Sequence, residues 1–566
     1  MTNRPAARLA GAIDQRLRSW ASDRVAERLW DKDGSLWAAS GKRPEELTRW
    51  LGWLDLPDAM SERTAELTHL AESIWRDGYA RGAVLGMGGS SLAPELFSRL
   101  FAAPGGAPSE SPGVELRICD STHPDAVRGF REWAATARTI FCVSSKSGTT
   151  TEPNAFHAAM AEIAPALDFL AITDPGTELA ELARAQEFRA IIEAPPDVGG
   201  RYSALSVFGL VPAALVGIDL DRLLGRARRM ADACRRPALE NPGLRLGAAI
   251  GEAVLAGRDK LTILTSPRLA SFGDWVEQLI AESTGKAGTG IIPVVGEPLG
   301  DPDRYGEDRY IVAVSLVEDP RTEWSELASA LAQRGHPGQH LELVDPYDLG
   351  AQFVLWEVAT AVAGIVLGID PFDQPNVQES KDATKALLAT FASTGSLPVP
   401  APLVVDEGIA VTADPATLGD TPVSVNGALD QLLSLVRPGD YVAILAYVAK
   451  DPETEALLQR VRAAIRDRLG VATTLGFGPR FLHSTGQLHK GGPDTCVFLQ
   501  ITADPRKDLP IPGWTESFGT LIAAQALGDL QSLQRRGRRV LRLHFNEPGA
   551  GLARLEGMVG AALVNA

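Results

Sequence analysis

Short hydrophobic runs that end in glycine or serine turns, each followed by an amphipathic segment, recur along most of the chain. The first three are RGAVLGMGGSSLAPELF at 81–97, TIFCVSSKSGTTTEPNAFHAAMAEI at 139–163 and LDFLAITDP at 167–175. A β-rich run followed by a helical period and another β-rich run is the βαβ pattern, which gives parallel strands covered by helices. These segments predict an α/β fold.

Two further sets of the same kind follow. LTILTSP at 261–267 and YIVAVSL at 310–316 lead into a long helical stretch at 351–367. Beyond it, four strand-like runs alternate with helical patterns and predict another α/β region. These runs are YVAILAYV, ATTLGFG, CVFLQIT and VLRLHF.

The remaining segments do not show this alternation of strand-like and helical patterns. Apolar residues at helical spacing in the first sixty residues predict a helical lead-in, and the stretch 390–420, rich in Pro, Thr and Ser, is the best candidate linker. We expect a helical lead-in at 1–60, a first α/β unit at 61–225, a second at 226–390, a linker at 391–420 and an α/β extension at 421–566.

Composition narrows the classes of protein. The chain has 566 residues with 71 acidic against 55 basic side chains, a net charge of −16, which argues against a nucleic-acid or anionic-membrane surface. No window approaches eighteen uninterrupted apolar residues, and the first twenty lack the apolar core of a secretion signal. The four cysteines lie too far apart for a zinc or redox motif. We therefore expect a cytoplasmic protein without a membrane partner, a nucleic-acid partner or a metal.

The turn VLGMGGSSLAPEL at 84–96 is the first candidate for chemistry. It puts Gly89 at the end of a strand and Ser90 at the start of a helix, where backbone N–H groups can hold an anion. Turns of this kind also occur only to pack a helix against a sheet, so the motif alone leaves both interpretations open. It matches neither a Walker loop nor G-x-G-x-x-G.

The turn SSKSGTTTEP at 144–153 is the second candidate. Ser145, Lys146, Ser147 and Thr150 crowd hydroxyl groups and one ammonium group between a strand and a helix. A phosphate dianion favours that density of donors. Helix capping, with Glu152 in the first turn, is the alternative.

Together the motifs resemble a known family. GMGGSSLAPEL and SSKSGTTTEP resemble the sugar-isomerase (SIS) domain, and GGRYSALSVFGL, AESTGK and DPFDQPNVQESK are similar to the glucose-6-phosphate isomerase family, in that family's order over about residues 80–385. The resemblance implies two SIS domains, an aldose–ketose isomerase acting on glucose 6-phosphate and fructose 6-phosphate, no cofactor or metal, and a homodimer.

The resemblance also implies roles for individual residues. Glu282 is the proton-transferring base, Arg201 stabilises the enediolate, and Lys381 lies beside the ring oxygen and O1. The phosphate group would be held by Gly89, Ser90, Ser145, Lys146, Ser147, Thr150 and Gln374. Roles without a catalytic function stay open at this point: Glu282 and Lys286 could form a surface i, i+4 pair, Arg201 could be an exposed turn residue, and Lys381 could be a surface lysine.

The histidine that opens the sugar ring is displaced in this sequence. The family places it between the Glu and Lys motifs, where this chain has only His336 and His340. The better likeness, HSTGQLHKGG at 483–492, gives His483 the catalytic position, with His489 as the alternative; a core or capping role stays open for either. This tail resembles the isomerase half of bifunctional transaldolase/glucose-6-phosphate isomerase proteins and leaves a functional association with a transaldolase open.

The reaction suits these residue types. A carboxylate can accept the carbon proton and return it to the neighbouring carbon, a guanidinium can stabilise the oxyanion, and a histidine can move protons at the ring oxygen. Two alternatives remain: a non-catalytic SIS sugar-phosphate sensor, and an isomerase with other or dual sugar-phosphate specificity.

Overall fold

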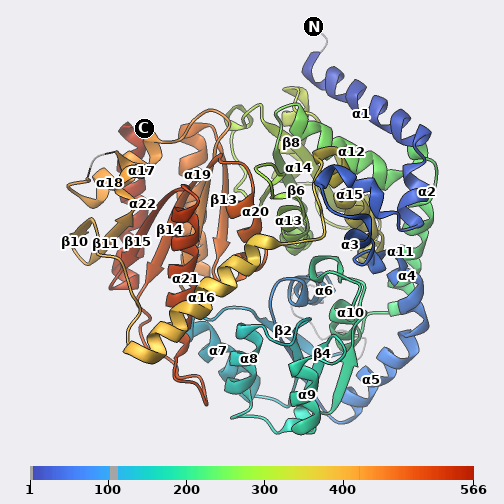
Figure 1. The fold of residues 1–566 in the computed structure, drawn as a ribbon, viewed down its shortest axis with the longest axis horizontal. Coiled ribbons are helices and arrows are strands. Elements are labelled where there is room, and N and C mark those ends of the chain that lie inside the picture. The colour runs from blue at the N-terminus through green and yellow to red at the C-terminus, as the bar shows by residue number, and fades with distance from the viewer. Residues whose placement is uncertain (1–3, 102–112, 420, 566) are drawn as a thin grey trace.

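The computed structural model describes residues 4–101, 113–419 and 421–565. Helices of the N-terminal segment run along one side of the molecule, in blue in Figure 1. The first packs against α12 (Pro242–Leu255) and the last against α10 (Val207–Leu215), so the segment connects two parts of the fold. The expected helical lead-in is confirmed by α1 (Arg4–Ser22), α2 (Val25–Trp30), α3 (Pro44–Thr48) and α4 (Leu56–Ala59). The next helix, α5 (Thr64–Arg76), lies beyond residue 60, in the range expected for the first α/β unit.

The first sheet has five parallel strands in the order β2-β1-β3-β4-β5. The strand order reverses between β1 and β3, which is where open α/β sheets bind ligands, at the carboxyl ends of the strands. The strands are β1 (Arg81–Gly86), β2 (Glu115–Cys119), β3 (Thr139–Ser144), β4 (Phe169–Thr173) and β5 (Ala190–Glu193). The helices between them are α6 (Leu92–Leu100), α7 (Pro124–Ala135), α8 (Thr151–Met160) and α9 (Glu178–Ala185).

The second sheet has four parallel strands in the order β7-β6-β8-β9. Its strands are β6 (Lys260–Thr265), β7 (Ile292–Val295), β8 (Arg309–Leu316) and β9 (Gly338–Leu343). Its helices are α11 (Leu220–Cys234), α13 (Ala270–Thr284), α14 (Glu323–Gln333) and α15 (Leu349–Leu367). Both predicted parallel-sheet units are thus present.

Helix α15 is the core helix of the second unit. Within the described residues, the stretch Pro346–Leu367 is the one helical stretch long and apolar enough to cross a membrane, and 83% of its most apolar window is buried. Helices α11, α12 and α13 pack around it. Its apolar surface is therefore used inside the protein.

The third sheet forms the C-terminal α/β extension, in orange and red in Figure 1. Its six strands have the order β10-β11-β15-β14-β12-β13, and the last four strands of the chain are mutually parallel. The strands are β10 (Val404–Asp406), β11 (Ile409–Ala413), β12 (Tyr441–Tyr447), β13 (Ala472–Phe477), β14 (Cys496–Ala503) and β15 (Arg539–Phe545). The helices are α17 (Pro415–Leu418), α18 (Val425–Ser434), α19 (Pro452–Leu469), α20 (Gly486–Gly491), α21 (Phe518–Arg535) and α22 (Pro548–Asn565).

The segment 391–420, expected to be a linker, contains structure. Strands β10 and β11 form a hairpin in it, and β11 pairs antiparallel with β15. Glu407 and Gly408 between the strands both have positive φ, 45° and 78°, as tight hairpin turns require. The alternating apolar residues Ile409 and Val411 are buried and favour a strand, which the richness of the segment in Pro and Thr obscured.

Two expected domain boundaries fall inside helices. The boundary at 225/226 lies within α11, and that at 390/391 lies within α16 (Pro375–Thr394). One continuous hydrophobic core joins the lead-in, one face of the first sheet and the second sheet. A second core, under the third sheet, is separate. Helix α16 packs against α21 and ties the second unit to the third.

A buried ion pair connects the second and third sheets. The Glu297 carboxylate, in the loop after β7, accepts from the Arg309 guanidinium at 2.7 and 3.2 Å. It also accepts from the backbone N–H and the hydroxyl group of Thr473 on β13, both at 2.9 Å. Burial alone would raise the pKa of Glu297, but Arg309 and these hydrogen bonds lower it.

We expect Glu297→Ala to lower the free energy of unfolding by about 3 kcal/mol, because it leaves the Arg309 charge buried and unpaired. Because the pKa of the folded carboxyl is lowered, its stabilisation is present at neutral pH and lost as the pH falls through that pKa. Thermal melting from pH 7 downward measures both effects. Glu326→Gln, on the exposed face of α14, is the control; equal melting temperatures for the two variants would contradict the prediction.

Candidate active site

A cavity of about 300 Å³ lies at the carboxyl ends of β1 and β3, where the strand order reverses. Its walls come from all three units. Every site residue predicted from the sequence lines this cavity except His489; the lining residues among them are Gly89, Ser90, Ser145, Lys146, Ser147, Thr150, Arg201, Glu282, Gln374, Lys381 and His483.

The glycine turn after β1 allows three segments to meet. Gly88 has a φ of 55°, and a Cβ atom there would lie 2.7 Å from the side-chain amide nitrogen of Gln278. A Cβ atom on Gly89 would lie 1.9 Å from the carbonyl oxygen of Gly200, the residue before Arg201. Close packing therefore accounts for these glycines in part, and Ser90 is buried at the cavity wall.

The hydroxyl-rich turn after β3 does not use its side chains as a helix cap. Thr150 occupies the N-cap position of α8, but its side chain forms no capping hydrogen bond. The hydroxyl group of Ser145 instead donates to that of Thr150 at 3.1 Å. Within this described turn, the capping alternative is thus disfavoured, and the hydroxyl groups line the cavity.

The Lys146 ammonium group forms an ion pair with Asp174, which follows β4. It also donates to the carbonyl oxygen of Pro196 at 3.2 Å. Burial raises the pKa of Asp174, and the neighbouring Lys146 opposes that rise. Asp174 lines the cavity and was not predicted from the sequence; an anion bound here would compete with it for Lys146.

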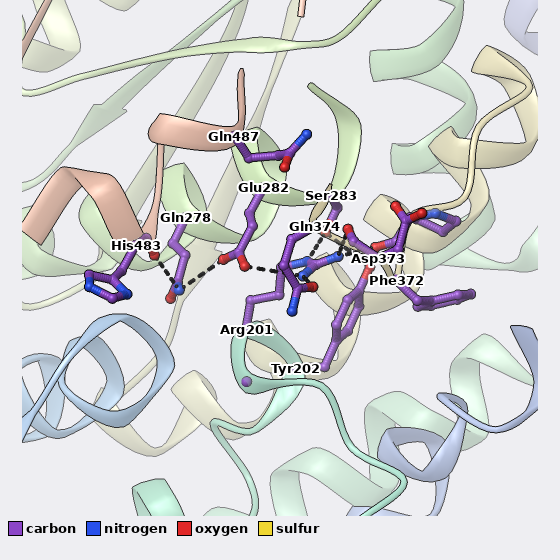
Figure 2. Close-up of polar contacts among 12 residues, drawn as sticks. Arg201, Tyr202, Gln278, Glu282, Ser283, Phe372, Asp373, Gln374, His483 and Gln487 are labelled. Carbon is purple, nitrogen blue, oxygen red and sulfur yellow. Dashed lines mark hydrogen bonds and ion pairs between the residues drawn. The ribbon is translucent and has the colours of Figure 1, made fainter. Parts of the chain in front are cut away.

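Glu282 lies near the end of α13 and is 7% exposed. One carboxylate oxygen accepts from the Arg201 guanidinium at 3.3 Å, and the other from the Gln278 amide at 3.1 Å, as Figure 2 shows. The same Gln278 nitrogen donates to the carbonyl oxygen of His483 at 2.8 Å. Gln278 was missed at the sequence level, although it lies one helical turn before Glu282.

The Arg201 guanidinium is buried and held on all sides (Figure 2). Besides Glu282, it donates to Ser283 Oγ at 2.7 Å and to Gln374 Oε1 at 2.8 Å. It also donates to the carbonyl oxygens of Pro371 and Asp373 at 2.7 and 3.0 Å. Arg201 is thus a fixed, buried cation and not an exposed turn residue.

Lys286 is also buried, which excludes a surface pair with Glu282. Its ammonium group donates to the carbonyl oxygen of Asp370 at 2.7 Å and to the Asp373 carboxylate at 2.8 Å. Burial and the nearby Arg201 charge lower the pKa of Lys286 to about 8. The lysine of the ESTGK motif therefore anchors the loop that presents Gln374.

His483 reaches the cavity from the third unit, through the short helix η12 (Arg480–His483). Its Nε2 lies 3.0 Å from the buried carboxylate of Glu152, which also accepts from Gln525 at 2.7 Å. Burial would raise the pKa of Glu152, but His483 and Lys381 lower it below its ordinary value. An ionised Glu152 can only accept, so Nε2 of His483 carries the proton of this bond.

The other histidines lie away from the cavity. His489 is buried between Phe481 and Phe498, with ring centroids 5.9 and 5.1 Å away, and burial lowers its pKa well below the ordinary value. His340 lies on β9 of the second sheet and His336 just before it, and neither lines the cavity. His483 is therefore the one histidine of the described residues at the cavity wall.

Lys381 lies on α16, is partly exposed and lines the cavity. With Lys146 and Arg201 it gives the cavity three cationic groups, against the carboxylates of Glu282 and Asp174. This local balance differs from the acidic chain as a whole and suits an anionic, hydroxyl-bearing ligand.

Similar sequences are known. A glucose-6-phosphate isomerase from Rubrobacter xylanophilus is 29% identical over 385 residues, 59% of this chain and 88% of that protein. One from Symbiobacterium thermophilum is 30% identical over 393 residues, 60% of this chain and 86% of that protein. No family model matches the chain.

Solved structures share the fold. A hypothetical protein from Thermus thermophilus superposes with a TM-score of 0.56 at 24% identity, over 68% of this chain and 98% of that one. A glucose-6-phosphate isomerase from Chlamydia trachomatis superposes with a TM-score of 0.50 at 18% identity, over 68% and 86% of the two chains.

The close approach at Gly89 makes a testable prediction. Gly89→Ala should lower the melting temperature and reduce the free energy of unfolding by about 1–3 kcal/mol, because a backbone oxygen occupies the space of the new methyl group. Gly200→Ala is the matched control, since a Cβ atom on Gly200 meets nothing within 4 Å. If both variants melt like the wild type, the two turns do not pack as described.

Proposed function

This chain belongs to the glucose-6-phosphate isomerase family, and from that premise we propose that it interconverts glucose 6-phosphate and fructose 6-phosphate. The observation that carries the proposal is the single cavity in which a buried carboxylate, a fixed guanidinium, an imidazole and a hydroxyl-rich turn come together. No metal or cofactor is needed for the steps below.

The phosphate group of the sugar would be bound at the turns after β1 and β3. Ser90, Ser145, Ser147 and Thr150 offer hydroxyl donors, and Lys146 supplies a positive charge. Binding would exchange the Asp174 partner of Lys146 for the phosphate dianion, a stronger acceptor with more oxygens. Gln374 would assist from the loop anchored by Lys286.

Glu282 would remove the proton from C2 of the open-chain aldose and return it to C1. Its two hydrogen bonds, from Arg201 and Gln278, support this role because they fix the carboxylate without using all of its lone pairs. The departing proton leaves an enediolate, whose negative charge the buried Arg201 guanidinium would stabilise. In the cis-enediol intermediate the O2–H proton moves to O1, and return of the proton from Glu282 to C1 then gives the ketose.

His483 would open the ring before this step. Nε2 is engaged with Glu152, which leaves Nδ1 to exchange a proton with the sugar, and Glu152 stabilises the imidazolium ion that forms. Lys381 would assist at the ring oxygen and O1. The imidazole ring of His483 can donate the proton to the ring oxygen of the sugar and recover it when the sugar ring closes again.

Two alternatives have less support. A non-catalytic sensor would need the phosphate-binding turns but not a buried Glu282 held by Arg201 and Gln278. An isomerase with another or a dual specificity would use the same machinery, and turnover of mannose 6-phosphate by the wild type separates that case.

The wider setting rests on the resemblance. We propose a soluble, cytoplasmic enzyme that forms a homodimer, with functional association with a transaldolase left open. The expected units, a lead-in, two SIS domains and an extension that supplies the histidine, are part of the same proposal, with the first boundary in α11 and the second in α16. Light scattering of the purified protein measures the oligomeric state.

Glu282→Gln should lower kcat by about 10²–10⁴-fold or more, because the amide cannot accept the carbon proton. Fructose 6-phosphate turnover, coupled to NADP reduction by glucose-6-phosphate dehydrogenase, measures this. Binding of the sugar phosphate should persist, whereas Lys146→Ala should mainly raise KM. Unchanged turnover in Glu282→Gln would refute the assignment of the base, and a wild type without turnover would refute the proposed reaction.

His483→Ala should lose ring opening, which can be followed apart from isomerisation. Exchange between the α and β anomers of glucose 6-phosphate needs ring opening but no carbon proton transfer, and NMR exchange spectroscopy measures it. Enzyme-dependent exchange should fall in His483→Ala but persist in Glu282→Gln. His489→Ala should lower the melting temperature and keep both activities; the opposite result for the two histidines would reverse their assignment.

A further inference from the structure

A second cluster of charged side chains lies behind the segment that carries His483. The Arg480 guanidinium contacts three carboxylates: Glu95 at 2.5 Å, Asp120 at 3.0 Å and Asp274 at 3.4 Å. The side chain of Arg480 is 20% exposed, and those of Glu95 and Asp120 are 10% and 15% exposed. Arg480 itself does not line the cavity.

The three carboxylates belong to the other two units. Glu95 lies on α6, Asp120 directly after β2, and Asp274 on α13. Arg480 belongs to η12 of the third unit. One guanidinium group therefore joins all three units at the place where the histidine segment meets the cavity.

The positive charge of Arg480 stabilises the ionised carboxylates around it. Burial would raise the pKa of Glu95, but Arg480 and Arg99 hold it at about 2. Burial raises the pKa of Asp120 in spite of the nearby Arg480. The group is a strong electrostatic attachment for η12.

Helix α13 presents its contacts to this segment at regular spacing. Asp274, Gln278 and Glu282 are four residues apart and so lie along one face of the helix. Asp274 contacts Arg480, Gln278 donates to the carbonyl oxygen of His483, and Glu282 is the proposed base. The arginine and the histidine carbonyl, three residues apart in η12, are thus held by successive turns of the helix that carries the base.

We propose that Arg480 is a positioning residue, which sets the location of the His483 imidazole relative to Glu282 by attaching η12 to Glu95, Asp120 and Asp274. This inference rests on the proposed function for its effect on turnover. Arg480 acts through His483, since it touches no part of the cavity. A displacement of about 1 Å of a reacting group can cost about 10²-fold in rate.

Arg480→Met should lower kcat by about 10- to 100-fold and leave KM within about twofold, because the side chain of Arg480 contacts Glu95, Asp120 and Asp274 and none of the proposed phosphate-binding residues. Enzyme-dependent anomer exchange should fall in step with kcat, since ring opening is the step that needs His483. Arg480→Lys should recover part of the lost kcat and part of the lost anomer exchange. Arg460→Met is the matched control, an arginine of the same unit whose partner is Glu556 on the exposed side.

A second variant separates positioning from folding. Arg480→Met combined with Asp120→Asn and Asp274→Asn removes the repulsion that the single substitution creates, and should restore the melting temperature but not kcat. Recovery of kcat together with the melting temperature, or wild-type kcat in Arg480→Met itself, would overturn the inference.

A readout without substrate keeps the two proposals distinguishable. The NMR signal of the His483 Nε2 proton, assigned by its loss in His483→Ala, should shift or broaden in Arg480→Met as the bond to Glu152 is lost. An unchanged signal would overturn the positioning role. If the wild type failed to isomerise, the proposed function would fall while this signal would still decide the role of Arg480.

Discussion

The amide group of Gln278 connects two parts of the chain that lie about two hundred residues apart. Its nitrogen donates both to the Glu282 carboxylate and to the backbone carbonyl of His483. The Glu282 carboxylate and the segment that carries the His483 imidazole line one cavity, and this single side chain fixes one relative to the other. The turn after β1 has glycines at 88 and 89 because the Gln278 amide and the Gly200 carbonyl occupy the space that Cβ atoms would need.

Several hydrogen bonds of the two buried cations, Arg201 and Lys286, go to uncharged acceptors. Arg201 and Lys286 direct several of their donors to the carbonyl oxygens of Asp370, Pro371 and Asp373. A carbonyl oxygen satisfies a donor without cancelling its charge, so these contacts fix both cations without reducing their field. Carboxylates are partners as well: Arg201 also pairs with Glu282, Lys286 with Asp373, and Lys146 with Asp174.

Residues whose signal is local could be predicted from the sequence. Strands β1, β3 and β4 of the first sheet, β6 and β8 of the second and β12 to β15 of the third follow from βαβ periodicity, whereas β2, β5, β7 and β9 were not predicted. Most of the cavity residues came from five motifs whose backbone geometry is self-contained. Glu152 and Gln278 were missed because their roles depend on partners on distant segments, as with the bond between Glu152 and His483. The hairpin at 404–413 was taken for a linker, since a strand stabilised by pairing with β15 carries little signal of its own.

The position of β15 has a consequence for synthesis. It lies between β14 and β11, so the sheet that carries the histidine segment remains open until nearly the whole described chain has been made. The first two sheets share one core and precede it in the sequence, and domains generally fold in the order in which they leave the ribosome. A nascent chain can thus hold the turn after β3 and Glu282 in place while His483 is still missing, and the cavity is complete only once the third unit has been made.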